Sequence, residues 1–336
     1  MAALIQSLFN IFSSQEDVID EPYEVVKRRS DYDVTDTVCV TDSKAVSKEV
    51  CRLYSLLYPS ASTEKIAQAF NDLALIYSGD YPDYHASETP YHDIQHSLDG
   101  VLCMVRILSG YNASEPEMNR IDSSLAELGI IVSLFCDVGY IRHHDDQFTP
   151  NGAVYTSSHV TRGGEFLSEY LHKLELDHHV ALAKKLIHFT GYEVEVAKIQ
   201  SESYKHKMLG YIIGSADLVS QLADRCYLEK CSERLYVEFV YAKLVRPETG
   251  GEAGVDYIFD SRDDLMKMTT HFITFSIEKR LEETLGGVHN HLATFFGGTN
   301  PYLEFMKKNE KYLASQLARG GWRRALRRTL PNPLIK

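Results

Sequence analysis

The stretch GIIVSLFCDVGY, residues 129–140, combines a long apolar run with an aspartate at its end. The run is typical of a helix buried in a protein core. Asp137 follows it directly, and a buried carboxylate is costly to desolvate unless it is hydrogen-bonded, paired or bound to a metal ion. This stretch alone leaves two interpretations open: Asp137 caps the next segment, or it belongs to a polar site inside the fold.

Length and composition limit the classes of protein to consider. A chain of 336 residues can form a substantial core. Its formal net charge of −12 argues against broad nucleic-acid binding. The six cysteines match neither a zinc ribbon nor a disulfide framework, so we expect reduced thiols in a cytoplasmic protein. No basic region precedes the first apolar residues, and no apolar run approaches the ~20 residues of a transmembrane segment, so we predict a soluble protein.

The hydrophobic pattern predicts an all-α fold. Apolar residues recur at helical spacing over residues 46–318, with no period-two run and no alternation of strands and helices. Residues 15–45 mix charges with few large hydrophobic residues, and we predict that residues 1–45 form a partly ordered N-terminal arm. Within this arm, residues 2–13 form a short amphipathic segment. Residues 319–336 form a basic tail.

The basic tail has two possible roles. It contains six basic side chains and no acidic one. It either lies on the acidic surface of its own chain or contacts another protein or an anionic surface. The basic residues are Arg319, Arg323, Arg324, Arg327, Arg328 and Lys336.

Six polar residues in or beside the predicted helices are the main candidates for a functional site: His92, His96, Asp137, His159, His188 and Asp217. The last four are separated by 22, 29 and 29 residues, so each belongs to a different helix. A helical bundle can direct such side chains to one point, and imidazoles with carboxylates are the ligands that divalent transition metals prefer. One histidine on an apolar helix is usually a core residue, but six such positions favour a metal site.

Other polar clusters are weaker candidates. The serines before His159 lack the context of a nucleophile elbow. The run HHDD at residues 143–146 is typical of a solvated loop. His289 and His291 lie between glycine pairs, which favours a flexible loop over a metal site.

The candidate residues resemble a known superfamily. Their order resembles that of the HD-domain metal-dependent phosphohydrolases, over roughly residues 50–245. YHDIQHSLDGV, residues 91–101, is similar to the YHNxxHAxDV signature of class I cyclic nucleotide phosphodiesterases. The spacing of His159 and His188 resembles the dinuclear branch that includes HD-GYP proteins. The resemblance implies an HD/PDEase-like helical bundle.

The resemblance also implies roles for individual residues. His96 and Asp217 match ligands of a first metal ion, and Asp137 matches the aspartate that bridges two metals. His159 and His188 match ligands of the second metal. The two divalent ions, Zn, Mn, Fe or Mg, would hold a hydroxide that attacks a (cyclic) nucleotide-like phosphate ester. His92 matches the histidine that protonates the leaving oxygen.

Cys136 is the main departure from the superfamily pattern, because it replaces the histidine of the His-Asp dipeptide. A Cys136 thiolate can itself bind a metal. Alternatively the first site is lost, and the protein is a catalytically silent relative that binds a nucleotide or a partner protein. A purely structural helical module is a third hypothesis. No base-clamping glutamine is recognisable after Asp217, and the GYP motif is absent.

Overall fold

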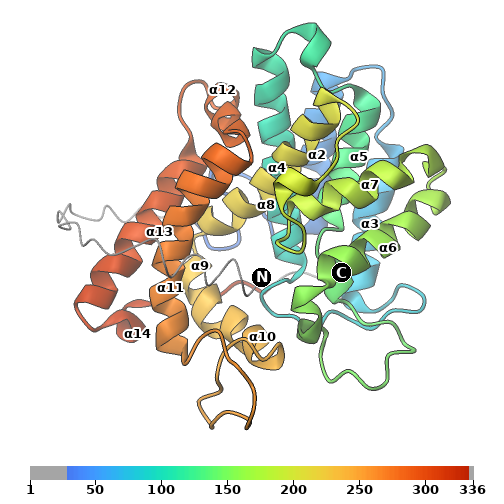
Figure 1. Cartoon of the computed structure of the whole chain (residues 1–336). Coiled ribbons are helices and arrows are strands. Elements are labelled where there is room, and N and C mark those ends of the chain that lie inside the picture. Colours follow the sequence, from blue (N-terminus) through green and yellow to red (C-terminus); the bar gives the residue numbers. More distant parts are fainter. Residues whose placement is uncertain (1–28, 333–336) are drawn as a thin grey trace.

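The structure, a computed structural model, describes residues 29–332, and this part of the chain is helical without a β-strand (Figure 1). The predicted all-α class is confirmed. The amphipathic segment at residues 2–13 lies outside the described residues. The α-helices are α2 (Ser43–Leu57), α3 (Glu64–Ser78), α4 (Ile94–Ser114), α5 (Ser123–Leu134), α6 (His159–Lys173), α7 (Val180–Leu186), α8 (Tyr204–Ala223), α9 (Tyr227–Lys230), α10 (Tyr236–Tyr241), α11 (Arg262–Phe275), α12 (His291–Phe295), α13 (Pro301–Ala318) and α14 (Trp322–Ala325).

Shorter helical segments join several of these helices. Two of them are π-helical and follow α9 and α11, and the others that matter below are 3₁₀ turns. A π-helical segment carries an extra residue per turn and often marks a functional site. The segments are η2 (Val138–Tyr140), η3 (Gly152–Ser157), η5 (Ile187–Phe189), η7 (Cys231–Leu235), η8 (Ser276–Thr284) and η9 (Val288–Asn290).

Helices α4 and α8 form the centre of the molecule. They pack against each other, with α5, α6 and α7 to one side and α11, α13 and α14 to the other (Figure 1). Both are buried around most of their circumference, as expected for helices that are apolar on nearly every face. Gly110 lets α12 approach α4, because a Cβ atom there would lie 1.9 Å from the carbonyl oxygen of His291.

Helix boundaries place His96 and Asp137 at the ends of core helices. Asp93 caps α4 by accepting a hydrogen bond from the backbone N–H of His96 at 3.1 Å. Helix α5 ends at Leu134, so Asp137 lies in the connection to η2 and not on the apolar helix itself. This end is earlier than the sequence pattern predicts.

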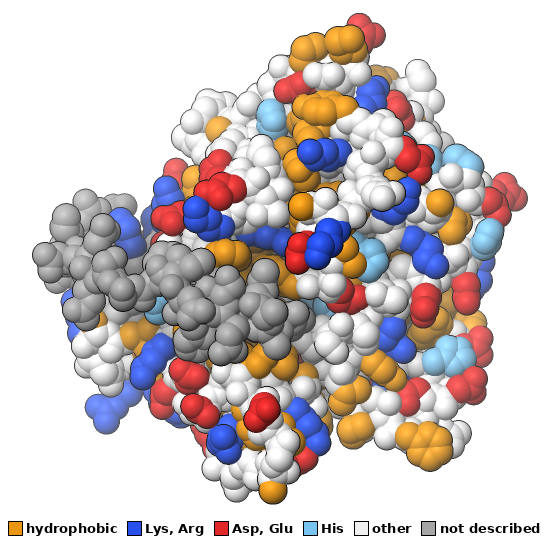
Figure 2. All heavy atoms as spheres, viewed as in Figure 1, with side chains coloured by type: hydrophobic (Ala, Val, Ile, Leu, Met, Phe, Trp, Pro, Cys, Tyr) orange, Lys and Arg blue, Asp and Glu red, His pale blue; other side chains and the backbone are white. Residues whose placement is uncertain are grey.

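The most apolar segment is internal to the fold. Ser123–Tyr140 is long and apolar enough to cross a membrane by length and composition alone, but 83% of it is buried among other helices. This burial is the pattern of a core helix. On the described part of the face in Figure 2, acidic and basic side chains are interspersed, without a continuous basic surface.

Part of the predicted N-terminal arm belongs to the core. Helix α2 begins at Ser43, capped by Asp42, and the residues before it pack against α4. Asp33 is 2% exposed and lies 2.7 Å from Nη2 of Arg106, which also donates to the hydroxyl of Tyr302 at 2.8 Å. A buried pair with these partners fixes this part of the arm to α4 and, through Arg106, to α13.

The described part of the basic tail pairs with acidic residues of the same chain. Trp322 donates from Nε1 to Asp263 at 2.8 Å, and Arg323 lies 3.3 Å from the same carboxylate. Arg328 lies 3.9 Å from Glu229.

The glycine-flanked histidines do not form a flexible loop, so that prediction is wrong. His289 is 1% exposed within η9, and His291 begins α12. The nearby glycines, Gly286 and Gly287, adopt positive φ angles that turn the chain into η9. The glycines therefore indicated the turn correctly, but they did not indicate that the histidines after it are packed in helical segments.

Candidate metal centre

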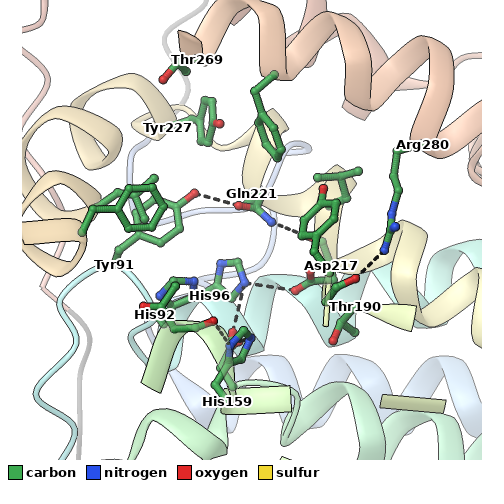
Figure 3. Close-up of a pocket in the computed structure, with 18 of the residues that line it drawn as sticks. Tyr91, His92, His96, His159, Thr190, Asp217, Gln221, Tyr227, Thr269 and Arg280 are labelled. Carbon is green, nitrogen blue, oxygen red and sulfur yellow. Dashed lines mark hydrogen bonds and ion pairs between the residues drawn. The ribbon is translucent and has the colours of Figure 1, made fainter. Parts of the chain in front are cut away.

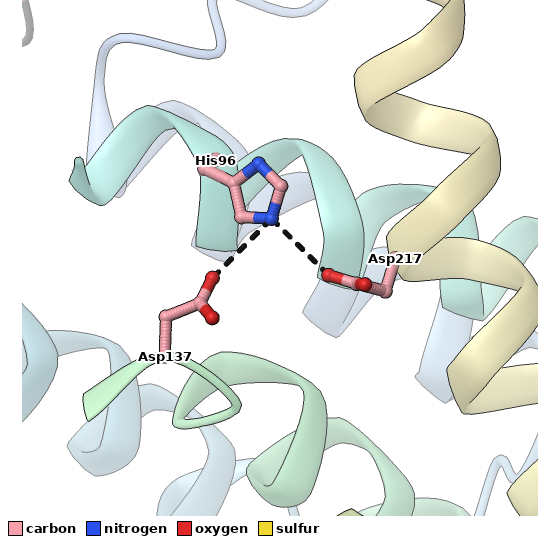
Figure 4. Close-up of side chains that lie close together, drawn as sticks. All are labelled: His96, Asp137 and Asp217. Carbon is pink, nitrogen blue, oxygen red and sulfur yellow. Dashed lines mark hydrogen bonds and ion pairs between the residues drawn. The ribbon is translucent and has the colours of Figure 1, made fainter. Parts of the chain in front are cut away.

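His96, Asp137 and Asp217 come together at the centre of the fold (Figure 4). His96 lies in the first turn of α4, Asp137 follows α5, and Asp217 belongs to α8. Nε2 of His96 lies 3.2 Å from Oδ2 of Asp137 and 3.1 Å from Oδ1 of Asp217. The possible ligand atoms of the three residues all lie within 4.8 Å of one another.

This group fits a divalent metal ion. Bonds of roughly 2.0–2.2 Å to nitrogen and oxygen place neighbouring ligand atoms about 3 Å apart. Oδ2 of Asp137 is buried and accepts no well-aligned hydrogen bond from the described residues, so this oxygen has capacity for a ligand. His96, Asp137 and Asp217 could therefore hold a metal ion.

The electrostatics of the group couple metal binding to a proton. Burial opposes the charged form of His96, but Asp137 and Asp217 outweigh burial and raise its pKa to about 9. Burial also raises the pKa of Asp137, but the imidazoles of His96 and its neighbours outweigh this and lower it. Without a metal, an imidazolium lies between two carboxylates, and a metal cation must displace its proton.

Cys136 lies at the edge of this group and not within it. Its Sγ lies 4.0 Å from Oδ1 of Asp217, to which the thiol can donate. Burial raises the pKa of the thiol well above its ordinary value, and the carboxylates of Asp137 and Asp217 raise it further. The side chain is therefore a neutral thiol, which is a poor metal ligand compared with a thiolate.

His159 joins the site from the start of α6. Its Nε2 lies 3.8 Å from Oδ1 of Asp137. Its Nδ1 lies 3.0 Å from the carbonyl oxygen of Thr156, so the Nδ1–H donates and Nε2 keeps a lone pair on the side of Asp137. Burial lowers the pKa of His159 and keeps the ring neutral.

Tyr140 packs against two of the candidate histidines. Its ring stacks on His92 with centroids 4.4 Å apart and on His159 with centroids 4.3 Å apart. Tyr140 was not among the residues predicted for the site, although it lies three positions after Asp137. The centroids of the two imidazoles lie 6.2 Å apart, so both rings pack on neighbouring parts of Tyr140, which restricts their orientation beside the aspartate.

Glu238 is a second residue that the sequence analysis missed. Its carboxylate is fully buried on α10, and Oε2 lies 2.6 Å from Nδ1 of His92. Its other oxygen accepts hydrogen bonds from the backbone N–H groups of Tyr91 and His92. Burial opposes protonation of His92, but Glu238 outweighs it and raises the pKa of the imidazole. No local motif signals a partner 146 residues away.

His188 is not brought to this group. It lies in η5, half-buried, and does not line the cavity described below. Its Nδ1 is buried without a hydrogen-bond partner among the described residues. Thr190, two residues further along, does reach the cavity.

The metal group forms one end of a cavity of about 200 Å³ (Figure 3). His92, Tyr140 and His159 line the same end. Gln221 lies further along, where it accepts a hydrogen bond from the hydroxyl of Tyr91 at 2.8 Å. The opposite wall is apolar and comes from α10, α11 and the connection between them. Its residues include Phe239, Phe259, Leu265, Met268, Phe272 and Phe275.

Comparisons with known proteins add no assignment to this geometry. No family model matches the sequence, and a search of curated proteins finds no match. The function of this chain is therefore inferred from the cavity, the His96, Asp137 and Asp217 group, and the residues beside it.

Proposed function

We propose that this protein is a metal-dependent phosphoric ester hydrolase of the HD-domain type, a phosphodiesterase acting on a (cyclic) nucleotide-like substrate. The observation that carries the proposal is the His96, Asp137 and Asp217 group at one end of a cavity that His92 also lines. A buried histidine and two carboxylates suit a divalent cation, and a cation suits a phosphate ester in a protein with a net charge of −12.

The ligands divide into two sets in this proposal. His96, Asp137 and Asp217 hold the first metal ion, and His159 with Asp137 supports a second. His188 is left out because it does not line the cavity. When bound, such ions supply Lewis-acid polarisation of a phosphoryl oxygen and activation of water.

His92 is the proton donor in this proposal. Its Nδ1 is held by Glu238, which leaves Nε2 to hand a proton to the departing oxygen. The raised pKa keeps a larger share of the imidazole protonated near neutral pH. Tyr140 keeps the ring in place by stacking.

The apolar wall accounts for the organic part of the substrate. Phe239, Phe272 and Phe275 present aromatic surface across the cavity from the metal group. Aromatic side chains bind flat rings by offset stacking or edge contacts, so a nucleobase or a similar ring suits this wall.

Metal content and turnover test the proposal together. We expect elemental analysis of the purified protein to find one or two divalent ions per chain. We also expect hydrolysis of bis(p-nitrophenyl) phosphate with added Mn²⁺ or Mg²⁺, and loss of both properties in His96→Ala. If the wild-type protein contains no bound metal and shows no turnover, the proposed hydrolase activity is refuted.

A catalytically silent nucleotide-binding protein is the second candidate, and Cys136 is the observation that favours it. Its neutral thiol stands beside the metal group without joining it. In that case the wild-type protein binds nucleotides without hydrolysing them, and Cys136→His creates activity. If the wild-type protein is active and Cys136→Ser keeps that activity, the silent candidate is wrong.

A further inference from the structure

Arg280 is a buried cation in the wall of the cavity. It belongs to the π-helical segment η8 and is 7% exposed. Nη2 donates to the carbonyl oxygens of Phe189 at 3.1 Å and Gly191 at 2.8 Å. In Figure 3 the side chain extends from its helix toward the side of the cavity where Thr190 and Asp217 lie.

The charge of Arg280 has no acidic partner among residues 29–332. Its guanidinium lies 4.5 Å from the ring centroid of Tyr192, and its Nε and Nη1 form no hydrogen bond with the described residues. Arg106, a comparably buried arginine, instead has Asp33 at 2.7 Å. A buried charge is costly without a counter-ion, so an unpaired guanidinium lining a cavity is arranged for an anion that enters it.

We propose that Arg280 binds an anionic oxygen of the substrate, which makes the ligand of this cavity a phosphate ester oriented between the metal group and the guanidinium. The inference deepens the proposed function and rests on it for the chemical class of the ligand. A planar guanidinium with free N–H groups matches a phosphate in geometry and charge. The anion is either the phosphoryl group that reacts or a second phosphate on the same molecule.

Two related substrates distinguish these sources. Thymidine 5′-(p-nitrophenyl phosphate) carries only the reacting phosphoryl group, and its 3′-phosphorylated analogue carries a second phosphate. Arg280→Gln is compared with wild type on both. Lys279→Gln is the matched control, because it removes a neighbouring positive charge that is exposed and paired with Glu283 at 2.6 Å.

We expect Arg280→Gln to lower kcat/KM by about 10- to 100-fold, the usual effect of losing a hydrogen bond to a charged group. A loss confined to the 3′-phosphorylated substrate assigns Arg280 to the second phosphate. An equal loss on both substrates assigns it to the reacting phosphoryl group. Unchanged kinetics on both substrates, with Lys279→Gln also unchanged, would overturn the proposal.

Binding without turnover separates this inference from the proposed function. Calorimetric titration with thymidine 3′,5′-bisphosphate measures anion binding even if the protein hydrolyses nothing. If wild type binds it and Arg280→Gln does not, the role of Arg280 stands although the enzyme fails. If wild type does not bind it, or the variant binds equally well, the inference is wrong. Arg280→Met, which keeps much of the length of the side chain without its charge, replaces Arg280→Gln if that variant does not fold.

Discussion

Nδ1 of His92 lies 2.6 Å from Oε2 of Glu238, and this contact joins the segment that leads into α4 to a fully buried carboxylate on α10. Glu238 also accepts two backbone hydrogen bonds, from Tyr91 and His92, so its position does not depend on the imidazole alone. The pair fixes the orientation of His92 in the cavity and favours its protonated form.

Replacing Glu238 should move the pH profile. The raised pKa of His92 means that the proton donor stays protonated to a higher pH, so activity falls as pH rises through that pKa. In Glu238→Gln this alkaline limb should shift to lower pH, and kcat should fall by about 10- to 100-fold. Glu229→Gln, which changes another buried carboxylate outside the cavity, should leave the profile in place. If the alkaline limb of the pH profile does not move in Glu238→Gln, His92 is not the proton donor whose titration limits activity.

Removing one carboxylate of the metal group should release the metal. Asp217→Asn should weaken divalent metal binding by more than about 100-fold, because a neutral amide replaces a charged ligand. Elemental analysis and calorimetric titration with Mn²⁺ measure the effect. Asp80→Asn, an exposed carboxylate after α3, serves as the control and should bind metal normally. Equal metal content in both variants would exclude Asp217 as a ligand.

Metal affinity should rise with pH. The pKa of about 9 for His96 means that a proton occupies the site through neutral pH and must leave when the metal enters. Calorimetry in buffers of different ionisation enthalpy should therefore show proton release that diminishes as pH approaches 9. An affinity independent of pH between 6 and 9 would contradict this role of His96.

The same proton affects the stability of the metal-free protein. The pKa of His96 in the folded state lies above its ordinary value of 6.5. Protonated His96 therefore stabilises the folded state fully below about pH 6.5, and this stabilisation is lost as pH rises through about 9. The Tm of the metal-free protein should therefore fall over this range in wild type. His96→Gln, which has no titrating ring, should show a smaller fall.

Tyr140 should be required for the stacked arrangement of the two histidines. Tyr140→Ala should destabilise the protein by about 3–5 kcal/mol, the usual cost of removing a large buried aromatic side chain. It should also reduce turnover, because His92 and His159 lose the ring that both pack against. Tyr140→Phe keeps the ring and should retain most of the activity. Equal loss in both variants would assign the effect to the hydroxyl and not to stacking.

The ion pair that attaches residues before α2 to the core should contribute to stability. Asp33→Ala leaves Arg106 buried without its carboxylate and should lower the free energy of unfolding by about 3–5 kcal/mol in urea denaturation. Asp36→Asn weakens an exposed pair with Arg29, keeps a residue type that tolerates the positive φ angle of this position, and should have little effect. Similar values for the two variants would show that Asp33 is not part of the core.

Local sequence pattern was sufficient to predict the fold class and part of the candidate site. Helical periodicity predicted the all-α class, because an apolar stripe that repeats every 3.6 residues can be buried only along one side of a helix. It also selected His96, Asp137 and Asp217, since each is a polar residue in or beside an apolar helix, and the structure brings these three together.

The tertiary structure alone decided which distant residues complete the site. Glu238 and Arg280 carry no local signal, because a carboxylate or guanidinium on a helix is ordinary until packing buries it against a cavity. His188 met the same sequence criteria as His159, yet η5 leaves it outside the cavity. Periodicity fixes which face of a helix is buried, but the rotation and contacts of packed helices fix which polar side chains meet, and these depend on the whole core.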